Sequence, residues 1–433
     1  MRINNLKSFF LVSATVFLLL GCSHTSAQKN TMYVDGRYLY DRNGEKVILK
    51  GFNAMIVYWD IHGNINFPEM EKTGANCCRI FWNLDYPKPL PSDLDKVLEN
   101  CIKYKMIPVI CLWDATGNWD KLQTCVDYWC SPEITPILQK YEKDLIVNIA
   151  NEPGDRAMGN EVFKTRYAEI VTQMRTAGIH TPLIIDADQW GRNADAVLDN
   201  GPYLLEQDPD HNLIFSWHLW DPENWGTGTK SEIDRIINKA ASTSICFIVG
   251  EFGPCEKCDN CASTKINWEY MIEKAYKNDI GYLAWVWKWT DCHSIVNNSN
   301  GKYGSWANST WGESIAVTNT YSIQKTSKRT VLLSSENIQN ISNDIIIKAF
   351  PNPANTKITF QYNLIDDGKF ELNIISLSGI KISNLVHEFK KAGTYYLDWV
   401  PPHDMKPGFY ILSYKLLTKG KILEKSAKFS VAK

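Results

Sequence analysis

The chain has 433 residues, 44% of them hydrophobic and 22% charged, which is an ordinary globular composition but too long for one average domain. The formal net charge of -2 argues against a nucleic-acid partner. Charge and tryptophan are unevenly spread, because residues 321–433 carry 16 Lys and Arg against 9 Asp and Glu but only one of the 16 Trp. Two units with different roles are therefore predicted.

The first 27 residues are predicted to be a signal peptide. Arg2 and Lys7 precede an apolar run over residues 9–20, which is too short for a convincing membrane span. The segment LLGC, ending at Cys22, resembles a bacterial lipoprotein processing site, whereas Thr25-Ser26-Ala27 resembles an ordinary signal-peptidase site. Export is expected, and a lipid anchor at Cys22 is an alternative to simple cleavage.

Eight short apolar runs recur, separated by stretches long enough for a helix. They cover residues 47–54, 75–82, 106–114, 145–153, 181–191, 212–220, 244–253 and 281–289. Helices are expected between them, for example over residues 91–105 with Ser92 as N-cap and over residues 161–178 closed by Gly178. The pattern predicts an α/β fold, a closed parallel (β/α)8 TIM barrel over residues 31–318. An open doubly wound sheet is the rival, but it usually has fewer strands and a Gly-rich phosphate loop, which is missing after the first run.

Eleven cysteines follow Cys22, all before residue 293. Export favours disulfides, so the cluster formed by Cys255, Cys258, Cys261 and Cys292 is expected to staple a long loop. A zinc site is the alternative, because the CxxC spacing suits tetrahedral thiolates. A further disulfide is suggested between Cys125 and Cys130. Cys111 and Cys246 lie in apolar runs and are predicted to be buried thiols.

The active site of a TIM barrel lies at the C-terminal ends of its strands. Seven indoles fall at the predicted strand ends, namely Trp82, Trp113, Trp190, Trp220, Trp285, Trp287 and Trp289. Indoles stack on sugar rings, and Arg79, Asn151 and His218 can hydrogen-bond sugar hydroxyls. Core packing is the alternative for any single Trp and is preferred for Trp285. The rim is therefore predicted to bind a polysaccharide, with Trp113, Trp190, Trp220 and Trp287 among the substrate-binding residues.

The stretch IVNIANEPGD places Glu152 where an apolar run ends. Alone, Glu152 could be a solvated carboxylate, with Asp155 capping the next helix. Glu251 ends the seventh predicted strand, so two carboxylates face one barrel mouth. Retaining glycosidases hold an acid/base and a nucleophile about 5–5.5 Å apart and keep one protonated while the other is ionised. Arg79 is expected to keep Glu251 ionised, and Asn151 to hold a substrate hydroxyl.

Residues 33–312 resemble glycoside hydrolase family 5, and most closely its bacterial endo-β-1,4-mannanases. The resemblance is carried by VDGRYLYDRNGEKVILKGFN, KTGANCCRIFW, DATG, DYW, IVNIANE, LIIDADQWG, VGEFG and GYLAWVW, in the family's order. It implies hydrolysis with retention, with Glu152 as acid/base, Glu251 as nucleophile and no cofactor or metal. Arg79, Asn151, His218 and Trp287 match the family's other site positions.

Two residues depart from the family pattern: Trp113 stands where the family usually has His, and Trp220 where it usually has Tyr. In addition, Pro153 after Glu152 is common in other branches, including cellulases. An endo-β-1,4-glucanase is therefore the nearest alternative, and a non-catalytic polysaccharide-binding barrel is an alternative of another class. A metal-dependent hydrolase using the cysteine cluster is a third.

Residues 319–343 are rich in Ser, Thr, Asn and Lys and are predicted to be a linker. Residues 344–433 alternate apolar and polar residues between turns, which predicts a small antiparallel β-sandwich. A carbohydrate-binding module is one interpretation, although Trp399 is its single indole. The segments FPNPANTKITF, ISLSGIKI and KPGFYIL instead resemble the sorting domain of the type IX secretion system. That resemblance implies a Bacteroidota-type bacterium and a secreted or cell-surface protein, which we expect to be a monomer.

Overall fold

The computed structural model describes residues 29–85, 88–307, 310–329, 347–364, 366–376, 381–403, 405–418 and 421–432. The predicted signal peptide, with Cys22, and residues 330–343 of the predicted linker lie outside these ranges. Among the described residues, no helix combines the length and hydropathy needed to cross a membrane.

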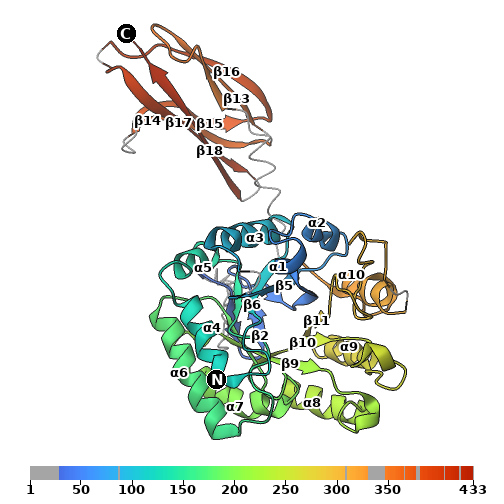
Figure 1. Ribbon diagram of the computed structural model, residues 1–433. Coiled ribbons are helices and arrows are strands. Elements are labelled where there is room, and N and C mark those ends of the chain that lie inside the picture. The colour runs from blue at the N-terminus through green and yellow to red at the C-terminus, as the bar shows by residue number, and fades with distance from the viewer. Residues whose placement is uncertain are drawn as a thin grey trace, which may run out of the picture.

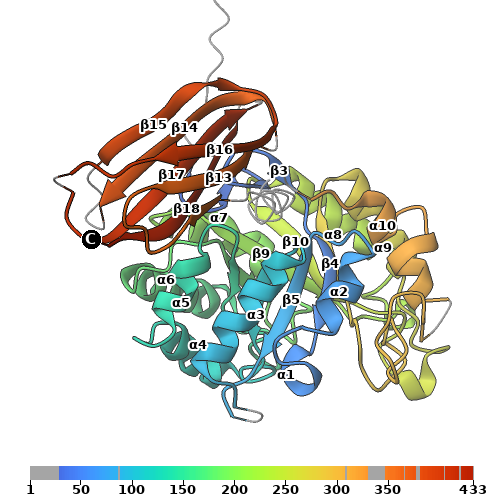
Figure 2. The same cartoon turned by 90° about the horizontal axis from the view of Figure 1, so that it is seen from above.

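Eight parallel strands form a closed barrel, in which the last strand pairs with the first (Figures 1 and 2). The strands are β4 (Lys50–Ala54), β5 (Cys77–Trp82), β6 (Ile107–Leu112), β7 (Ile146–Asn148), β8 (Leu183–Asp186), β9 (Leu213–Leu219), β10 (Cys246–Phe252) and β11 (Gly281–Ala284). Every residue of these strands is buried, which explains their continuous apolar runs. The predicted TIM barrel is confirmed.

Helices surround the barrel (Figure 1). They are α1 (Ile56–Trp59), α2 (Asn66–Glu71), α3 (Pro91–Lys103), α4 (Leu122–Trp129), α5 (Thr135–Tyr141), α6 (Asn160–Thr176), α7 (Ala194–Gln207), α8 (Lys230–Ser242), α9 (Trp268–Lys277) and α10 (Ile323–Thr326). Short helical turns are η1 (Trp119–Lys121), η2 (Glu223–Trp225), η3 (Cys258–Asn260) and η4 (Ser314–Thr318).

Two predicted helix boundaries differ from the structure, and one is confirmed. Ser92 is not the N-cap of α3, because Pro91 already occupies the first helical position, which suits a residue without an N–H. Likewise Asp155 does not cap α6, which begins at Asn160. Gly178 does follow the end of α6, with a φ of 87° that favours glycine.

A small antiparallel sheet closes the N-terminal end of the barrel. It consists of β1 (Tyr33–Asp35), β2 (Tyr38–Tyr40) and β3 (Lys46–Val47). Its apolar side chains share a core with residues at the starts of the barrel strands, such as Ile107 and Ile146. The Asn212 side chain accepts the Val34 N–H at 3.0 Å. A ligand therefore has to enter from the opposite end, where the strands finish.

The C-terminal region contains two antiparallel sheets packed on one core. The first has the order β12 (Ile347–Phe350), β13 (Ile358–Leu364), β16 (Gly393–Trp399), and the second β15 (Lys381–Lys390), β14 (Gly368–Ser376), β17 (Gly408–Thr418), β18 (Lys421–Val431). Burial alternates along β13, as a strand with one solvated face requires. Both sheets contribute to the core, and Trp399 packs there against Phe360 and Phe429. The predicted β-sandwich is confirmed.

The cysteine predictions are partly confirmed. The cluster forms two disulfides, Cys255–Cys261 and Cys258–Cys292, and Cys111 and Cys246 are buried free thiols. The suggested disulfide between Cys125 and Cys130 is wrong, because both thiols are free. Cys125 lies in α4 and Cys130 directly follows it, and five residues turn a helix by about 500°, so the two side chains leave on different faces.

Candidate active site

A cavity of about 330 Å³ lies at the C-terminal ends of the barrel strands. Its lining residues are Met55, Trp113, Glu152, Trp190, Arg192, Trp220, Glu251, Glu256, Trp285, Trp289, Asp291 and His293. The two predicted glutamates and three of the four predicted substrate-binding indoles therefore meet in one place. The chemistry available there depends on how the glutamates are held.

Glu152 follows β7 in an uncommon backbone conformation, with a φ of 40°. Its N–H donates to Asp186 Oδ2 at 3.2 Å, and its carbonyl accepts the Gly117 N–H at 2.9 Å. A non-glycine residue with positive φ persists only when its surroundings fix it, and such residues concentrate at functional sites. The buried network around Glu152 supplies that constraint and turns its side chain into the cavity.

Glu152 and Glu251 are close neighbours, and each is more than 90% buried. A carboxylate oxygen of each lies within 4.8 Å of the other and of a ring nitrogen of His218. Inverting glycosidases separate their carboxyls by about 6.5–9.5 Å to admit a water, whereas retaining enzymes hold them about 5–5.5 Å apart. The spacing here lies below the range that inverting enzymes use.

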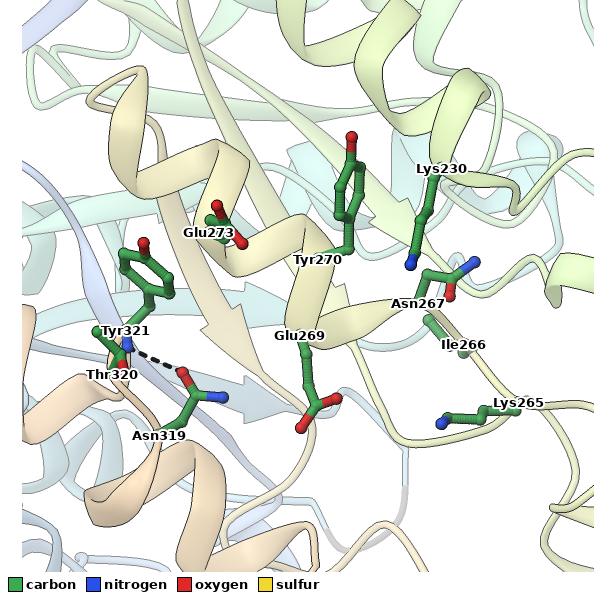
Figure 3. Close-up of a pocket in the computed structure, with 10 residues that line it drawn as sticks. All are labelled: Lys230, Lys265, Ile266, Asn267, Glu269, Tyr270, Glu273, Asn319, Thr320 and Tyr321. Atoms are coloured by element: carbon green, nitrogen blue, oxygen red, sulfur yellow. Dashed lines mark hydrogen bonds between the residues drawn. The ribbon is translucent and has the colours of Figure 1, made fainter.

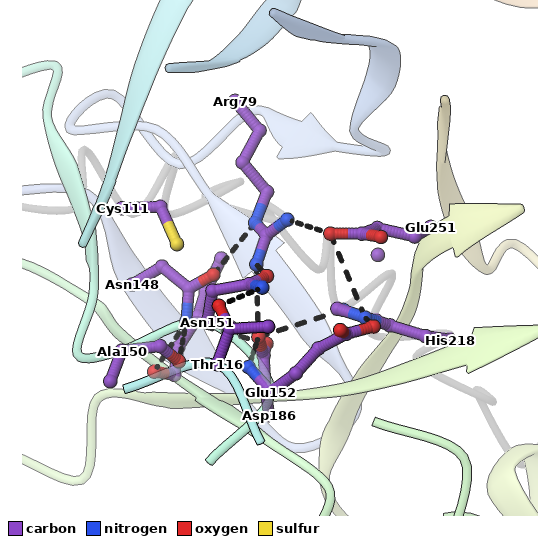
Figure 4. A network of polar contacts seen from close by, with 12 residues as sticks. Arg79, Cys111, Thr116, Asn148, Ala150, Asn151, Glu152, Asp186, His218 and Glu251 are labelled. Atoms are coloured by element: carbon purple, nitrogen blue, oxygen red, sulfur yellow. Dashed lines mark hydrogen bonds and ion pairs between the residues drawn. The ribbon is translucent and has the colours of Figure 1, made fainter. Parts of the chain in front are cut away.

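The Arg79 guanidinium, 1% exposed, organises the floor of the cavity (Figure 4). It donates to Glu251 Oε1 at 2.6 Å, Asp186 Oδ2 at 2.9 Å, Asn151 Oδ1 at 2.8 Å, Asn148 Oδ1 at 2.7 Å and Asn53 Oδ1 at 3.1 Å. The predicted contact between Arg79 and Glu251 is present. With all its donors engaged, Arg79 holds Glu251 in one orientation.

Burial and charge give the carboxyls around Arg79 different proton affinities. Burial and the nearby Glu251 carboxylate raise the pKa of Glu152 to about 7. Burial would also raise the pKa of Asp186, but the charge of Arg79 outweighs it and lowers that pKa to about 2. Asp186 is therefore an anion at neutral pH, whereas the raised pKa of Glu152 favours its protonated form more than that of an ordinary glutamate.

His218 lies between the carboxyls. Its Nδ1 is 2.6 Å from Glu152 Oε1, and its Nε2 is 3.6 Å from Asp186 Oδ2. Burial opposes its charged form, but Glu251 and Asp186 together raise the pKa of His218 to about 10, so the ring is a cation at neutral pH. Gly250 leaves room for the ring, because a Cβ there would lie 2.8 Å from Nε2.

Trp220 supplies a donor to the second glutamate, since its Nε1–H donates to Glu251 Oε2 at 3.2 Å. Trp113 stacks on Trp285 with ring centroids 5.9 Å apart, and both rings line the cavity. Trp190, 43% exposed, packs against Gly117, where any side chain would collide with the indole. These four indoles thus line the same cavity as the two carboxyls.

The prediction that Trp287 binds substrate is wrong, whereas the core packing preferred for Trp285 is present, since Trp285 is buried in a cluster with Phe81 and Met55. β11 ends at Ala284, and the Trp287 N–H donates back to the Asn53 carbonyl of β4 at 2.9 Å. This return places the Trp287 ring in the core, fully buried and 5.0 Å from the Phe52 ring. Trp285 lines the cavity in its place.

Two other predicted residues lie behind the cavity wall. Asn151 is fully buried, with its side-chain oxygen on Arg79 and its Nδ2 donating to Thr116 Oγ1 at 2.8 Å. Trp82 is also buried and donates to the Tyr128 hydroxyl at 3.1 Å. Asn151 therefore contacts the site through Arg79, and neither side chain lines the cavity in this structure.

Sequence reasoning placed Asp186 among the strand-end residues but gave it no role, and it did not single out the wall formed by Glu256, Asp291 and His293. Asp186 is the last residue of β8, and its place near the end of an apolar run was a usable signal. The wall belongs to segments 253–265 and 290–296, which the disulfide Cys258–Cys292 joins, and Cys255–Cys261 closes a loop within the first of them. These segments follow β10 and β11, and the pairing of Cys258 with Cys292, which the sequence does not specify, joins them beside the cavity.

Another hollow, of about 430 Å³, lies on the outside of the barrel (Figure 3). It is lined by Lys230, Lys265, Ile266, Asn267, Glu269, Tyr270, Glu273, Asn319, Thr320 and Tyr321. These residues come from α8, α9 and the segments beside them, so none stands at the C-terminal end of a barrel strand. We therefore assign the chemistry to the cavity that contains Glu152 and Glu251.

The barrel and its paired glutamates define a glycoside hydrolase. Comparison with known proteins agrees, because residues 41–291 match the family described as Cellulase (glycosyl hydrolase family 5). The chain belongs to glycosyl hydrolase family 5, and it is an enzyme of the mannanase or cellulase type.

Three relatives illustrate the similarity. The chain is 28% identical to a mannan endo-1,4-β-mannosidase of Salipaludibacillus agaradhaerens, over 70% of this chain and 96% of that protein. It is 24% identical to a mannan endo-1,4-β-mannosidase of Cellvibrio japonicus (strain Ueda107), over 69% of each chain. The solved catalytic domain of a mannanase from Streptomyces sp. SirexAA-E superposes with a TM-score of 0.62 at 20% identity, covering 75% of this chain and 98% of that domain.

Proposed function

We propose that the protein is an endo-β-1,4-mannanase that hydrolyses its substrate with retention, using Glu251 as nucleophile and Glu152 as acid/base. One observation carries the assignment of roles: the two carboxyls lie within 4.8 Å but in different environments. Glu251 contacts the Arg79 guanidinium, which favours a carboxylate, whereas the pKa of Glu152 is raised to about 7. One group can attack while the other delivers a proton.

The mechanism has two displacements. A Glu251 oxygen attacks the anomeric carbon as the glycosidic bond breaks, and the proton of Glu152 passes to the leaving oxygen, giving a glycosyl-enzyme ester. Glu152, now a carboxylate, takes a proton from water as that water attacks the same carbon and releases Glu251. Arg79 and the Trp220 N–H orient Glu251 throughout, and His218 lies beside Glu152.

The pH profile tests the role of Glu152. Because proton donation requires the protonated form, kcat/KM on mannan oligosaccharides should fall about tenfold per pH unit above about pH 7. His218 stays protonated there because its pKa is raised to about 10. With Glu152→Gln and a dinitrophenyl β-mannobioside, whose leaving group needs no proton, this descending limb should disappear while much of the bond cleavage survives. A limb that persists at the same pH would assign proton donation to another group.

The choice of mannan is supported by the two mannan endo-1,4-β-mannosidases that align over about 70% of this chain. β-1,4-Glucan is the alternative, supported by the family's description as Cellulase and by Pro153. Incubation with mannan, glucomannan, cellulose and xylan, with the products sized by chromatography, decides between them. We expect a ladder of short oligosaccharides from mannan and glucomannan at early times, and release from cellulose alone would select the alternative.

Endo action is supported by a second hollow beside the cavity, of about 430 Å³, which shares Trp190 and Arg192 with it. Its lining also includes Asp155, which follows β7 and Glu152, and Gln189, which follows β8. The hollow therefore lies on the side of the acid, and hence on the side of the leaving group. Trp225 lines it with 46% of its surface exposed. Sugar units beyond the scissile bond can occupy this hollow.

Trp225→Ala should therefore raise KM for a mannan hexasaccharide by roughly fivefold, the scale of one aromatic contact, with kcat little changed. Steady-state kinetics on the hexasaccharide provide the measurement. Tyr276→Ala, which removes an equally exposed ring from α9, is the control and should leave KM unchanged. Equal KM values for wild type and Trp225→Ala would mean that the hollow binds no sugar.

We also propose that the protein is exported and reaches the cell surface or medium through the type IX secretion machinery. Support comes from the leader-like residues 1–27 and from the sequence motifs that the C-terminal sandwich carries. Removing residues 344–433 in a Bacteroidota host should leave activity inside the cell envelope, whereas the full chain should deliver it outside. A truncated chain that still reached the medium would remove the sorting role, and labelling with a radioactive fatty acid would test the lipid anchor at Cys22.

A further inference from the structure

The wall of the cavity next to Glu251 is unusually cross-linked. Cys258–Cys292 joins the segment after β10 to the segment after β11, and Cys255–Cys261 closes a short loop within the first of these segments. The two disulfides adjoin each other, since Cys255 Sγ and Cys292 Sγ are 3.6 Å apart. Such staples stabilise a fold in general, but their position here suggests a more specific role.

His293, next to Cys292, is held from several directions. Its ring Nε2 lies 2.9 Å from the Cys255 carbonyl oxygen. Its backbone N–H donates to Asp291 Oδ1 at 2.9 Å, and its backbone carbonyl accepts the Trp311 indole N–H at 2.8 Å. The side chain is buried and lies against the Cys258–Cys292 sulfurs, with Nδ1 3.4 Å from Cys258 Sγ. The stapled segments thereby fix the plane of the His293 ring.

That ring packs edge-to-face on Trp220, with centroids 5.3 Å apart and planes at 82°. Gly253 allows the contact, because a Cβ there would lie 2.9 Å from each ring. Trp285 contacts Trp220 at a longer centroid distance of 6.3 Å. An indole has one N–H on a large rigid ring, so packing on the ring determines where that donor points. Here it points at Glu251 Oε2.

We propose that His293 and the Cys258–Cys292 disulfide form a buttress that positions the Trp220 N–H on Glu251 and thereby orients the nucleophile. His293, Cys258 and Cys292 are positioning residues, since they act through Trp220. The inference rests on the proposed role of Glu251. It predicts that loosening the buttress impairs attack by Glu251, rather than substrate binding or protonation of the leaving group.

The test uses the full chain and a dinitrophenyl β-mannobioside, whose departure needs no acid, so the rate of glycosyl-enzyme formation reports attack by Glu251 alone. Trp220→Phe, which keeps a ring but loses the donor, should lower this rate about 10- to 100-fold, as expected for a lost hydrogen bond to a charged group. His293→Ala and the pair Cys258→Ala/Cys292→Ala should each lower it about tenfold, with KM changed less than threefold. Cys130→Ala, which removes a free thiol at the C-terminal end of α4, is the control and should match wild type.

Combining the substitutions separates a buttress from a general stabiliser. If His293 and the disulfide act through Trp220, adding either change to Trp220→Phe should lower the rate by less than twofold more, because the effects share one route. Losses that multiply instead, or single variants that keep wild-type rates, would overturn the proposal. If the Cys258→Ala/Cys292→Ala variant fails to fold, the double-mutant cycle of His293→Ala and Trp220→Phe gives the same answer.

Failure of the proposed function would look different. In that case Glu251→Gln would turn over the substrate at nearly the wild-type rate. If only the buttress proposal fails, Glu251→Gln remains inactive while the losses from Trp220→Phe and His293→Ala multiply.

Discussion

Glu251→Gln should lower kcat on mannan by at least about 10⁴-fold while leaving the fold intact, because the amide cannot form the glycosyl-enzyme ester. The variant should still fold, since the amide oxygen can accept from Arg79 in the place of Oε1. Its affinity for oligosaccharides should stay near that of wild type, because the indoles around the cavity are untouched.

Reducing-end release and calorimetric titration with a mannan hexasaccharide measure the two expectations separately. Glu269→Gln, in the outer hollow of Figure 3, is a control of the same chemistry on an exposed side chain and should keep full activity. A Glu251→Gln enzyme with more than a hundredth of wild-type activity would show that another group is the nucleophile.

The barrel and the two glutamates could be predicted from sequence because both depend on strong, local signals. A strand buried on both faces must be apolar throughout, so eight such runs mark eight strands. A carboxylate directly after such a run has a defined place, since all parallel strands finish at one face. Glu152 and Glu251 therefore came together in the structure, although they are 99 positions apart in the chain.

Predictions that depended on the direction of a side chain beyond a strand end were less successful. Trp285 and Trp287 are two residues apart, and their different fates follow from the hydrogen bond by which Trp287 returns to Asn53, a contact between distant segments. Predictions at helix ends failed for the same reason, since Ser92 is not the N-cap of α3 and Cys125 and Cys130 form no disulfide. Such details are decided by tertiary contacts that a single sequence does not display.

The second large effect concerns stability, and it follows from the burial of Arg79. Arg79→Met should lower the free energy of unfolding at pH 7 by about 3–5 kcal/mol, because Asp186 and Glu251, both buried, lose their cation. Urea denaturation measures it. Arg235→Met is the control, since Arg235 also binds two carboxylates, Glu232 and Asp195, but is 45% exposed and should cost less than about 1 kcal/mol.

The pH dependence of that loss identifies its cause. In wild type the pKa of Asp186 is lowered to about 2, so its ionisation stabilises the fold above its unfolded pKa of about 3.9 and ceases to do so as the pH falls toward 2. Without Arg79, burial makes the same ionisation unfavourable, so the variant should lose stability as the pH rises through that range. The difference between wild type and Arg79→Met should therefore be larger at pH 7 than at pH 4. A difference independent of pH would assign the stabilisation by Arg79 to packing of its side chain rather than to its charge.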